Sequence, residues 1–222
     1  MKSNVYVLIP AGGSGTRFGG ATKKQFLILH GQTLLMRSLK TFLECPEVKQ
    51  IVVAMPADEL RVAQSSSPED RVICVVGGEN RAASVKKAFL ALPPCAADDV
   101  ILIHDAVRPL VSADLIQRVI HGVIKNGTAL PVVPVTDTIK EVLADHVVRT
   151  CDRALLRAAQ TPQGVRYGIL QDTYKKIGDD LTLATDEAML LEQAGHKVYT
   201  VVGDVRNIKV TTPFDLKVAE LL

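Results

Sequence analysis

Apolar runs divide the first half of the chain, and segments with apolar residues three and four positions apart lie between them. The runs predict four buried strands, over Val5–Pro10, Gln50–Pro56, Val72–Val76 and Val100–His104. The intervening segments predict three helices, over Thr33–Glu44, Ser84–Leu92 and Ser112–Lys125, the last with Ser112 as its cap. This alternation favours a Rossmann-like α/β fold, with an open, mostly parallel sheet and helices on both faces.

The segment Val135–Arg153 does not follow this alternation. Its apolar residues stand among charged ones, and a turn-like Ala144-Asp145-His146 divides it. We therefore expect a small β-arm that protrudes from the sheet. The apolar side of such an arm needs a cover, and a second copy of the chain is the simplest one, so the pattern predicts a homodimer.

The last part of the chain returns to helical and strand patterns. It predicts a helix over Ala184–Ala194, strands over Lys197–Val202 and Asn207–Val210, and a final helix from Pro213, where proline suits a first turn. The chain has 222 residues and no internal repeat. Residues 1–222 are therefore expected to form one domain, with the arm as an appendage.

Three segments that are glycine-rich or polar directly follow predicted strands. Residues 11–24 follow the first strand, Gly77–Arg81 the third and Asp105–Pro109 the fourth. Ligands of open α/β sheets bind at the carboxyl ends of the strands. The three segments are therefore expected to form one site.

Residues 10–26 read Pro-Ala-Gly-Gly-Ser-Gly-Thr-Arg-Phe-Gly-Gly-Ala-Thr-Lys-Lys-Gln-Phe and contain five glycines, one arginine and two lysines. Glycine lets backbone N–H groups approach phosphate oxygens closely, and Arg17 and Lys24 would add positive charge. Nucleotidyl transfer builds negative charge at the α-phosphate, where fixed cations are most useful. The loop therefore predicts a cradle for a nucleoside triphosphate.

Two other glycine-rich loops do not fit this sequence. A Walker loop ends in Gly-Lys-Ser/Thr, but Ala21 follows Gly20 where the lysine would stand. A dinucleotide fingerprint needs a third glycine after Gly13 and Gly15, where the chain has Phe18, and no acidic residue ends the second strand. Nucleotide hydrolysis and hydride transfer are therefore disfavoured, and an NAD-dependent oxidoreductase is kept only because the fold is similar.

The overall composition mainly argues against certain classes of protein and partner. Hydrophobic residues make up 47% and charged residues 23%, which is typical of a soluble globular protein. The formal net charge of +2 argues against nucleic acid as a partner. The start of the chain does not resemble a signal peptide and no apolar stretch reaches about 20 residues, so a cytoplasmic protein without a membrane partner is expected. The four cysteines are far apart and are expected to be buried free thiols: Cys45, Cys74, Cys95 and Cys151.

Seven short motifs occur in order along the chain. They are Pro10–Arg17, Lys24–Phe26, Asp105–Pro109, Asp137–Thr138, Thr161–Gln163, Thr185–Glu187 and Asn207–Thr211. In combination they resemble the 2-C-methyl-D-erythritol 4-phosphate cytidylyltransferase family over the whole length. The resemblance implies transfer of the CMP moiety of CTP to 2-C-methyl-D-erythritol 4-phosphate, giving 4-diphosphocytidyl-2-C-methyl-D-erythritol and pyrophosphate in the non-mevalonate route to isoprenoids. It also implies Mg²⁺ or another divalent cation and a homodimer linked by an arm.

The resemblance assigns the glycine-rich loop and two further strand ends to CTP. Arg17 and Lys24 match the pair that stabilises the transition state at the α-phosphate. The residues that match CTP contacts are Pro10, Ala11, Gly12, Gly13, Ser14, Gly15, Gly78, Glu79, Ser84, Asp105 and Ala106. For Ser84 a helix cap is a second role, compatible with the CTP contact, and Arg81 is as readily a solvated surface residue as a ligand contact.

The resemblance assigns a second set of residues to the acceptor: Asp105, Arg108, Thr138, Arg153, Thr161, Thr185 and Lys209. Arg153 and Lys209 match the residues that grip the acceptor phosphate and aim its oxygen. Arg108 and Thr138 match residues presented to a neighbouring subunit's site. Asp105 follows a buried strand, where an unpaired carboxylate is costly, so a magnesium ion, a substrate hydroxyl or Arg108 is its expected partner.

One position departs from the family's pattern. Lys23 stands where the family usually has a proline before the lysine of the loop, so the loop loses a backbone restraint and Lys23 becomes a competing phosphate ligand. Lys24 keeps the Lys-Gln-aromatic context and is favoured. Two other functions stay open: a cytidylyltransferase for ribitol or ribulose 5-phosphate, and a non-catalytic nucleotide-binding regulator with the same fold.

Overall fold

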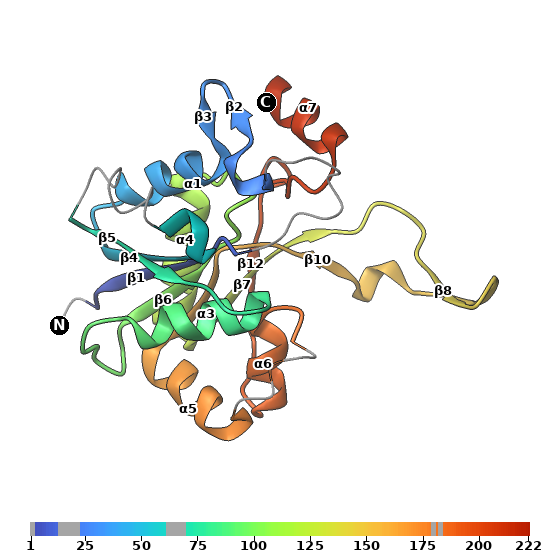
Figure 1. Ribbon diagram of the computed structural model, residues 1–222. Coiled ribbons are helices and arrows are strands. Elements are labelled where there is room, and N and C mark those ends of the chain that lie inside the picture. Colours follow the sequence, from blue (N-terminus) through green and yellow to red (C-terminus); the bar gives the residue numbers. More distant parts are fainter. Residues whose placement is uncertain (1–2, 13–22, 61–69, 179–180, 182–183) are drawn as a thin grey trace.

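The computed structural model describes residues 3–12, 23–60, 70–178, 181 and 184–222 of the protein. Its main sheet has the strand order β10-β7-β11-β6-β1-β4-β5, and β12 pairs with β7 (Figure 1). The strands are β1 (Val5–Pro10), β4 (Val48–Met55), β5 (Val72–Val76), β6 (Val100–Ile103), β7 (Thr128–Pro134), β10 (Arg157–Ala159), β11 (Gln163–Arg166) and β12 (Thr200–Val202). Strands β5, β4, β1 and β6 run parallel, whereas β11 lies antiparallel between β6 and β7.

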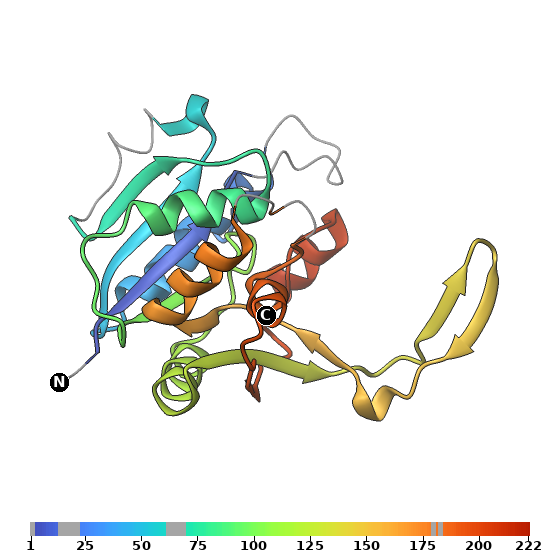
Figure 2. The ribbon, with the colours of Figure 1, turned by 90° about the horizontal axis from the view of Figure 1, so that it is seen from below.

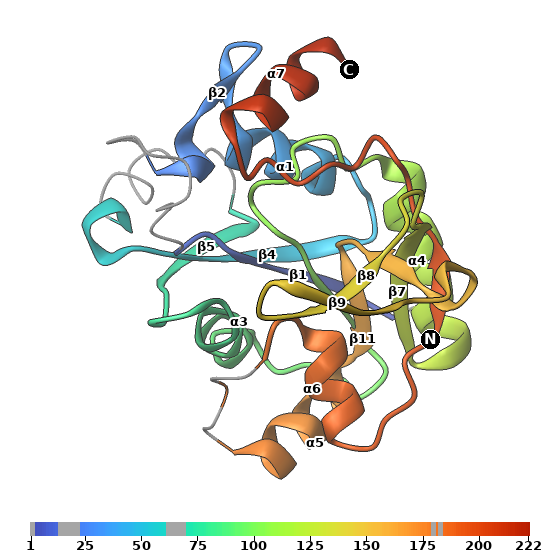
Figure 3. The ribbon, with the colours of Figure 1, turned by 90° about the vertical axis from the view of Figure 1, so that its right-hand side faces the viewer.

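Helices cover both faces of this sheet, as predicted (Figure 3). The helices on one face are α1 (Leu34–Leu43) and α4 (Ala113–Asn126), and those on the other are α3 (Arg81–Leu90), α5 (Tyr167–Ile177) and α6 (Glu187–Gln193). Side chains alternate along β1, so Val5, Val7 and Ile9 belong to the first core and Tyr6 and Leu8 to the second. A strand buried on both faces needs a continuous apolar run, which is the pattern that its sequence shows.

Polar side chains set where the helices begin. The Ser112 hydroxyl accepts a hydrogen bond from the Leu115 backbone N–H at 3.2 Å and caps α4, as predicted. Helix α3 begins earlier than predicted, because Asn80 accepts from the Ala83 N–H at 2.8 Å. Ser84 is therefore not the cap of this helix, and that interpretation is wrong.

The β-arm predicted over residues 135–153 is present. Strands β8 (Lys140–Leu143) and β9 (His146–Thr150) form an antiparallel hairpin that projects away from the main sheet (Figures 1 and 2). A short 3-10 helix, η3 (Arg153–Leu155), follows on the way back to the body. Val142 and Val147 pair across the hairpin and are each more than half exposed. This chain leaves the apolar side of its own arm uncovered.

The C-terminal segment forms a small third core. Helix α7 (Pro213–Leu221) begins at a capping box and packs beside the hairpin of β2 (Ile28–Leu29) and β3 (Gln32–Thr33). The strand predicted over 207–210 is wrong, since this segment is irregular. Its apolar pattern arises because Val210 is buried in the third core, where its N–H donates to the Val107 carbonyl at 2.9 Å.

Two further features concern the character of the chain as a whole. Over the described ranges, no helix combines the length and the apolar character that crossing a membrane requires. The four cysteines are free thiols, as predicted, but only Cys45 is buried, and the other three are half-buried.

Candidate active site

A pocket of about 310 Å³ opens at the carboxyl ends of β1, β5 and β6. The residues that line it are Pro10, Ala11, Gly12, Lys24, Gln25, Gly78, Glu79, Asn80, Arg81, Ser84, Asp105, Ala106, Val107 and Lys209. They come from all three segments that follow these strands and from the irregular segment before α7. The structure therefore brings the three predicted segments together around one pocket.

The described ends of the glycine-rich loop lie side by side at this pocket. Pro10, Ala11 and Gly12 leave β1, and the Gln25 amide donates to the Ala11 carbonyl at 2.6 Å. Gln25 thereby ties the return of the loop to its start. Four predicted CTP-site residues lie outside the described residues: Gly13, Ser14, Gly15 and Arg17.

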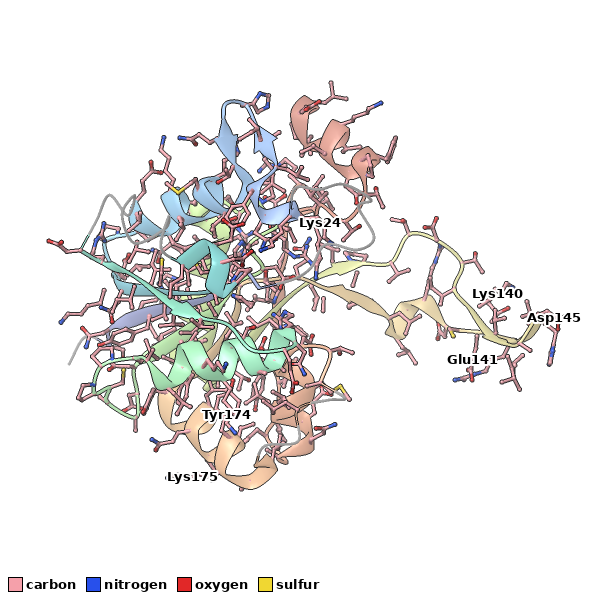
Figure 4. All side chains as sticks on the ribbon, in the orientation of Figure 1. Lys24, Lys140, Glu141, Asp145, Tyr174 and Lys175 are labelled. Carbon is pink, nitrogen blue, oxygen red and sulfur yellow. The ribbon has the colours of Figure 1, made fainter. Side chains whose placement is uncertain are left out.

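The two adjacent lysines take different positions. Lys23 Nζ lies 2.7 Å from Asp58 Oδ2, and this hydrogen bond raises the pKa of Lys23. The Lys23 backbone has φ −63° and ψ 137°, which is the φ that a proline would impose. Lys24 opens the short helix η2 (Lys24–Phe26) and lines the pocket on the body of the molecule (Figure 4). The geometry thus favours Lys24 over Lys23 as the cation of the nucleotide site.

A tight turn after β5 forms the opposite wall. The Gly78 N–H donates to the Ser84 hydroxyl at 3.0 Å, and that hydroxyl donates to the Asn80 carbonyl at 2.8 Å. A Cβ added at Gly78 would lie 2.5 Å from the Ala83 Cβ, so only glycine fits there. Ser84 therefore holds the turn against α3 while it lines the pocket.

Asp105 is the centre of an ion network at the floor of the pocket. Its Oδ1 lies 2.9 Å from Arg81 Nε, and its Oδ2 lies 2.9 Å from Lys209 Nζ and 3.7 Å from Arg108 Nε. Burial alone would raise the pKa of Asp105, but the three cations outweigh it and hold this pKa well below its usual range. The carboxylate is therefore ionised and already paired.

Arg81 connects this carboxylate to a second one. Its Nη1 lies 3.0 Å and 2.8 Å from the two carboxylate oxygens of Glu187, whose side chain is only 1% exposed. Burial would lower the pKa of Arg81, but Glu187 and Asp105 raise it, so the guanidinium stays charged. The surface interpretation of Arg81 is wrong. The sequence reasoning also missed Glu187 as a site residue, although it ends the Thr185–Glu187 motif.

The described residues do not form a resident divalent-cation site. No group of three His, Cys, Asp or Glu side chains within them could hold a metal ion. Both Asp105 oxygens face cationic side chains, which makes this carboxylate a poor ligand for a further cation. Asp105 therefore does not fit the predicted role of a magnesium ligand.

Thr161 lies beneath Asp105 instead of at the pocket surface. Its hydroxyl accepts from the Asp105 N–H at 3.1 Å and is 3.0 Å from His104 Nδ1. The hydroxyl therefore donates to Nδ1, and His104 carries its proton on Nε2, 3.2 Å from the Arg108 carbonyl. Burial lowers the pKa of His104 to about 4, so the ring is neutral. Thr161 is 4% exposed and positions Asp105, and its contact with the acceptor stays a prediction.

The other predicted acceptor residues do not converge on this pocket within one chain. Arg108 is buried and donates to the Asn207 carbonyl at 2.8 Å, and its role at a neighbouring subunit's site stays a prediction. Thr138 and Arg153 lie exposed on the arm, and Thr185 is exposed before α6. Of the acceptor set, the pocket brings together Asp105 and Lys209.

Comparison with known proteins identifies the family. The family model described as 2-C-methyl-D-erythritol 4-phosphate cytidylyltransferase matches residues 5–222. The chain belongs to this family. Its expected nucleotidyltransferase activity, dependent on CTP, is thereby confirmed.

Individual relatives cover almost the whole chain. The chain is 40% identical to the 2-C-methyl-D-erythritol 4-phosphate cytidylyltransferase of Geobacter metallireducens, over 97% of this chain and 96% of that protein. It is 41% identical to the protein of the same name from Rubrobacter xylanophilus, over 99% and 95%. The crystal structure of the Francisella tularensis enzyme of this name has a TM-score of 0.86 at 32% identity and covers 99% of both chains. The fold of this cytidylyltransferase is thus that of its solved relatives.

Proposed function

We propose that the chain works as one nucleotidyltransferase domain that transfers the CMP moiety of CTP to 2-C-methyl-D-erythritol 4-phosphate. The observation that carries this proposal is the pocket itself. Lys24 lines one wall and the tight turn at Gly78 the opposite one, and together they suit a triphosphate and a base. The other end holds Lys209, whose ammonium uses one donor on Asp105 and whose side chain is 42% exposed, which suits an acceptor phosphate.

The reaction requires no protein nucleophile. An oxygen of the acceptor phosphate attacks the α-phosphorus, the new P–O bond forms, and the bond to the β-phosphate oxygen breaks so that pyrophosphate leaves. The attacking phosphate is already anionic at neutral pH, so a general base is not needed. Lys24, with Arg17 from the loop, stabilises the charge that builds at the α-phosphate.

Lys209 positions the acceptor, and its attachment to Asp105 keeps the ammonium at one place. Rigid placement of the reacting oxygen lowers the entropic cost of the transfer. A divalent cation would reach this pocket bound to the triphosphate, because the described side chains offer it no site of their own. Its contribution when bound is to neutralise phosphate charge.

The arm residues complete the acceptor half in a homodimer. Arg153 and Thr138 lie on the exposed arm and not at the pocket of their own chain. The arm also carries uncovered apolar residues that a second copy would bury, including Val142 and Val147. An arm that crosses to its partner would bring Arg153 to the partner's acceptor site.

A pyrophosphate-release assay tests the proposed reaction. The purified protein is incubated with CTP and Mg²⁺ and with 2-C-methyl-D-erythritol 4-phosphate, ribitol 5-phosphate or ribulose 5-phosphate, and with ATP, GTP or UTP in place of CTP. Release should require CTP together with the methylerythritol acceptor. Faster release with either pentose-derived acceptor would favour the related cytidylyltransferase, and CTP binding without release would favour a regulator.

A further inference from the structure

Glu187 has no part in the reaction outlined above, yet it is buried as deeply as a core residue. It is the first residue of α6, and this helix end is fixed on two sides. The Asp186 side chain caps the helix, and the Gln163 amide donates to Asp186 at 2.8 Å and accepts from the Ala188 N–H at 3.0 Å. Burial raises the pKa of Glu187 above its usual value, against the opposing effect of Arg81. An ionised carboxylate at such a depth costs several kcal/mol unless it is paired. Arg81 supplies that pairing.

Arg81 divides one guanidinium between two carboxylates. Nη1 donates to Glu187 and Nε donates to Asp105 at 2.9 Å. The guanidinium is planar and its donors are fixed relative to one another. The position of Glu187 therefore determines which edge of Arg81 faces Asp105.

Asp105 is shared in turn between Arg81 and Lys209. Each of its oxygens has one cation at 2.9 Å, and Lys209 takes Oδ2. An arginine that is no longer held by Glu187 would turn more of its donors toward Asp105, because a bidentate pair is stronger than a single hydrogen bond. It would then compete with Lys209 for the same carboxylate.

We propose that Glu187 is a positioning residue for acceptor binding. Through Arg81 it holds Asp105 in the orientation that binds Lys209, and so it aims the Lys209 ammonium at the acceptor phosphate. The inference rests on the proposed function for the role of Lys209. The contacts that connect Glu187 to Lys209 are observed in the structure and do not depend on which reaction the protein catalyses.

Kinetics of the Glu187→Gln variant test the direction of this effect. The substitution keeps the shape of the side chain but removes the charge that holds Arg81. We expect kcat/KM for the acceptor to fall about 10- to 100-fold, while KM for CTP stays within about threefold. Glu192→Gln, on an exposed position of the same helix, is the matched control and should leave both parameters unchanged. Equal losses on the CTP and acceptor sides of the Glu187 variant would overturn the proposal.

A double-mutant cycle tests whether Glu187 acts through Arg81. In an Arg81→Met background, Glu187→Gln should change kcat/KM by less than about twofold, because the group that it positions is gone. The same loss in both backgrounds would show that Glu187 acts independently and would refute the proposal. If the single variant does not fold, Arg81→Met/Glu187→Leu removes the buried pair together. It should be as active as Arg81→Met alone, and a further loss contradicts the inference.

A crystal structure of ligand-free Glu187→Gln supplies a readout that does not depend on activity. The distance from Lys209 Nζ to Asp105 Oδ2 should increase from 2.9 Å to beyond about 3.5 Å. An unchanged distance sinks the inference even if the wild-type enzyme makes the expected product. A lengthened distance together with a wild-type protein that is inactive on CTP and 2-C-methyl-D-erythritol 4-phosphate supports the inference and sinks the proposed function alone.

Discussion

The adjacent residues Lys23 and Lys24 have different structural roles. Lys23 pairs with Asp58 at the surface, while Lys24 lines the pocket. The Lys23 backbone nevertheless keeps the φ of the proline that is usual in the family. The local conformation therefore survives the loss of the proline ring, and Lys24 keeps its place.

The two lysines should respond very differently to truncation. Lys24→Ala should reduce kcat by about 100-fold or more, because a fixed cation beside the α-phosphate is lost. Lys23→Ala, its matched control, should cost less than about threefold, since an exposed ion pair contributes little. Steady-state turnover with CTP and the acceptor gives both numbers. If Lys23→Ala were the more damaging change, the assignment of the phosphate ligand would be reversed.

His104 links folding to pH at the floor of the site. Burial lowers the pKa of His104 from 6.5 to about 4. Between these two pH values the imidazole is protonated in the unfolded chain but neutral in the folded protein. The unfolded state therefore binds more protons between pH 6.5 and 4, and the free energy of unfolding should decrease as the pH falls through this window. The contribution of His104 is at most about 3 kcal/mol.

Urea unfolding at pH 7, 6 and 5 measures this effect. The free energy of unfolding of the wild type should decrease more steeply than that of His104→Gln, which does not titrate there. His121→Gln, on an exposed position of α4, should follow the wild type. Parallel curves for wild type and His104→Gln would mean that the ring does not stay neutral in the fold.

At the scale of elements, helices and strands whose bounds depend on neighbouring residues were predicted more accurately than those that depend on distant contacts. Strands β1 and β5 match their predicted bounds. Strand β1 is buried on both faces and therefore apolar throughout. Strand β5 was expected to be buried too, but it lies at the edge of the sheet and its residues are half-buried or exposed. Helix α3 began three residues early because Asn80, and not Ser84, caps it. Strands β7 and β11 and helix α5 were not predicted, and Gln163–Arg166 is too short and mixed to show a strand period.

A helix cap that the sequence identified can be tested by itself. Ser112→Ala should lower the free energy of unfolding by about 1 kcal/mol, because one N–H at the start of α4 loses its acceptor, and Ser112→Asp should restore most of it. Activity should not change, since Ser112 does not line the pocket. Denaturant unfolding of the three proteins checks this, and an unaltered midpoint in Ser112→Ala would show that the cap contributes nothing.

At the scale of the whole molecule, the arm is the part that projects from the body. Figures 1 and 4 show it extending from the body, with Lys140, Glu141 and Asp145 toward its tip. Exposed apolar pairs on a thin hairpin are not stable by themselves in water. This arrangement makes sense if a second copy covers it.

Substitution on the arm should change the oligomeric state. Val147→Asp should convert a dimer to a monomer, because a charge would be buried at the contact. Leu90→Asp, on an exposed apolar residue of α3, is the control and should leave the dimer intact. Light scattering after size exclusion measures both, and a dimeric Val147→Asp protein would exclude this face of the arm from the contact.

Mixed dimers test whether the arm completes its partner's site. Arg153→Ala and Lys209→Ala should each be nearly inactive alone. If each site uses Lys209 of one chain and Arg153 of the other, one of the two sites in a mixed dimer is intact. An equal mixture should then recover about a quarter of the wild-type activity. No recovery on subunit exchange would place both residues in the same chain's site.

The sequence alone determined those features that depend on neighbouring residues. It predicted the strands around the site, the cap at Ser112, the protruding arm and the family. A continuous pattern of residues or an ordered set of motifs indicates each of these features. Only the tertiary structure decided which charges meet. Arg81 and Glu187 are 106 residues apart, and Thr161 reaches Asp105 from 56 residues away. No local sequence pattern predicts contacts between residues so far apart in the chain. The sheet order and the position of α6 bring these side chains together and determine which of them face the pocket.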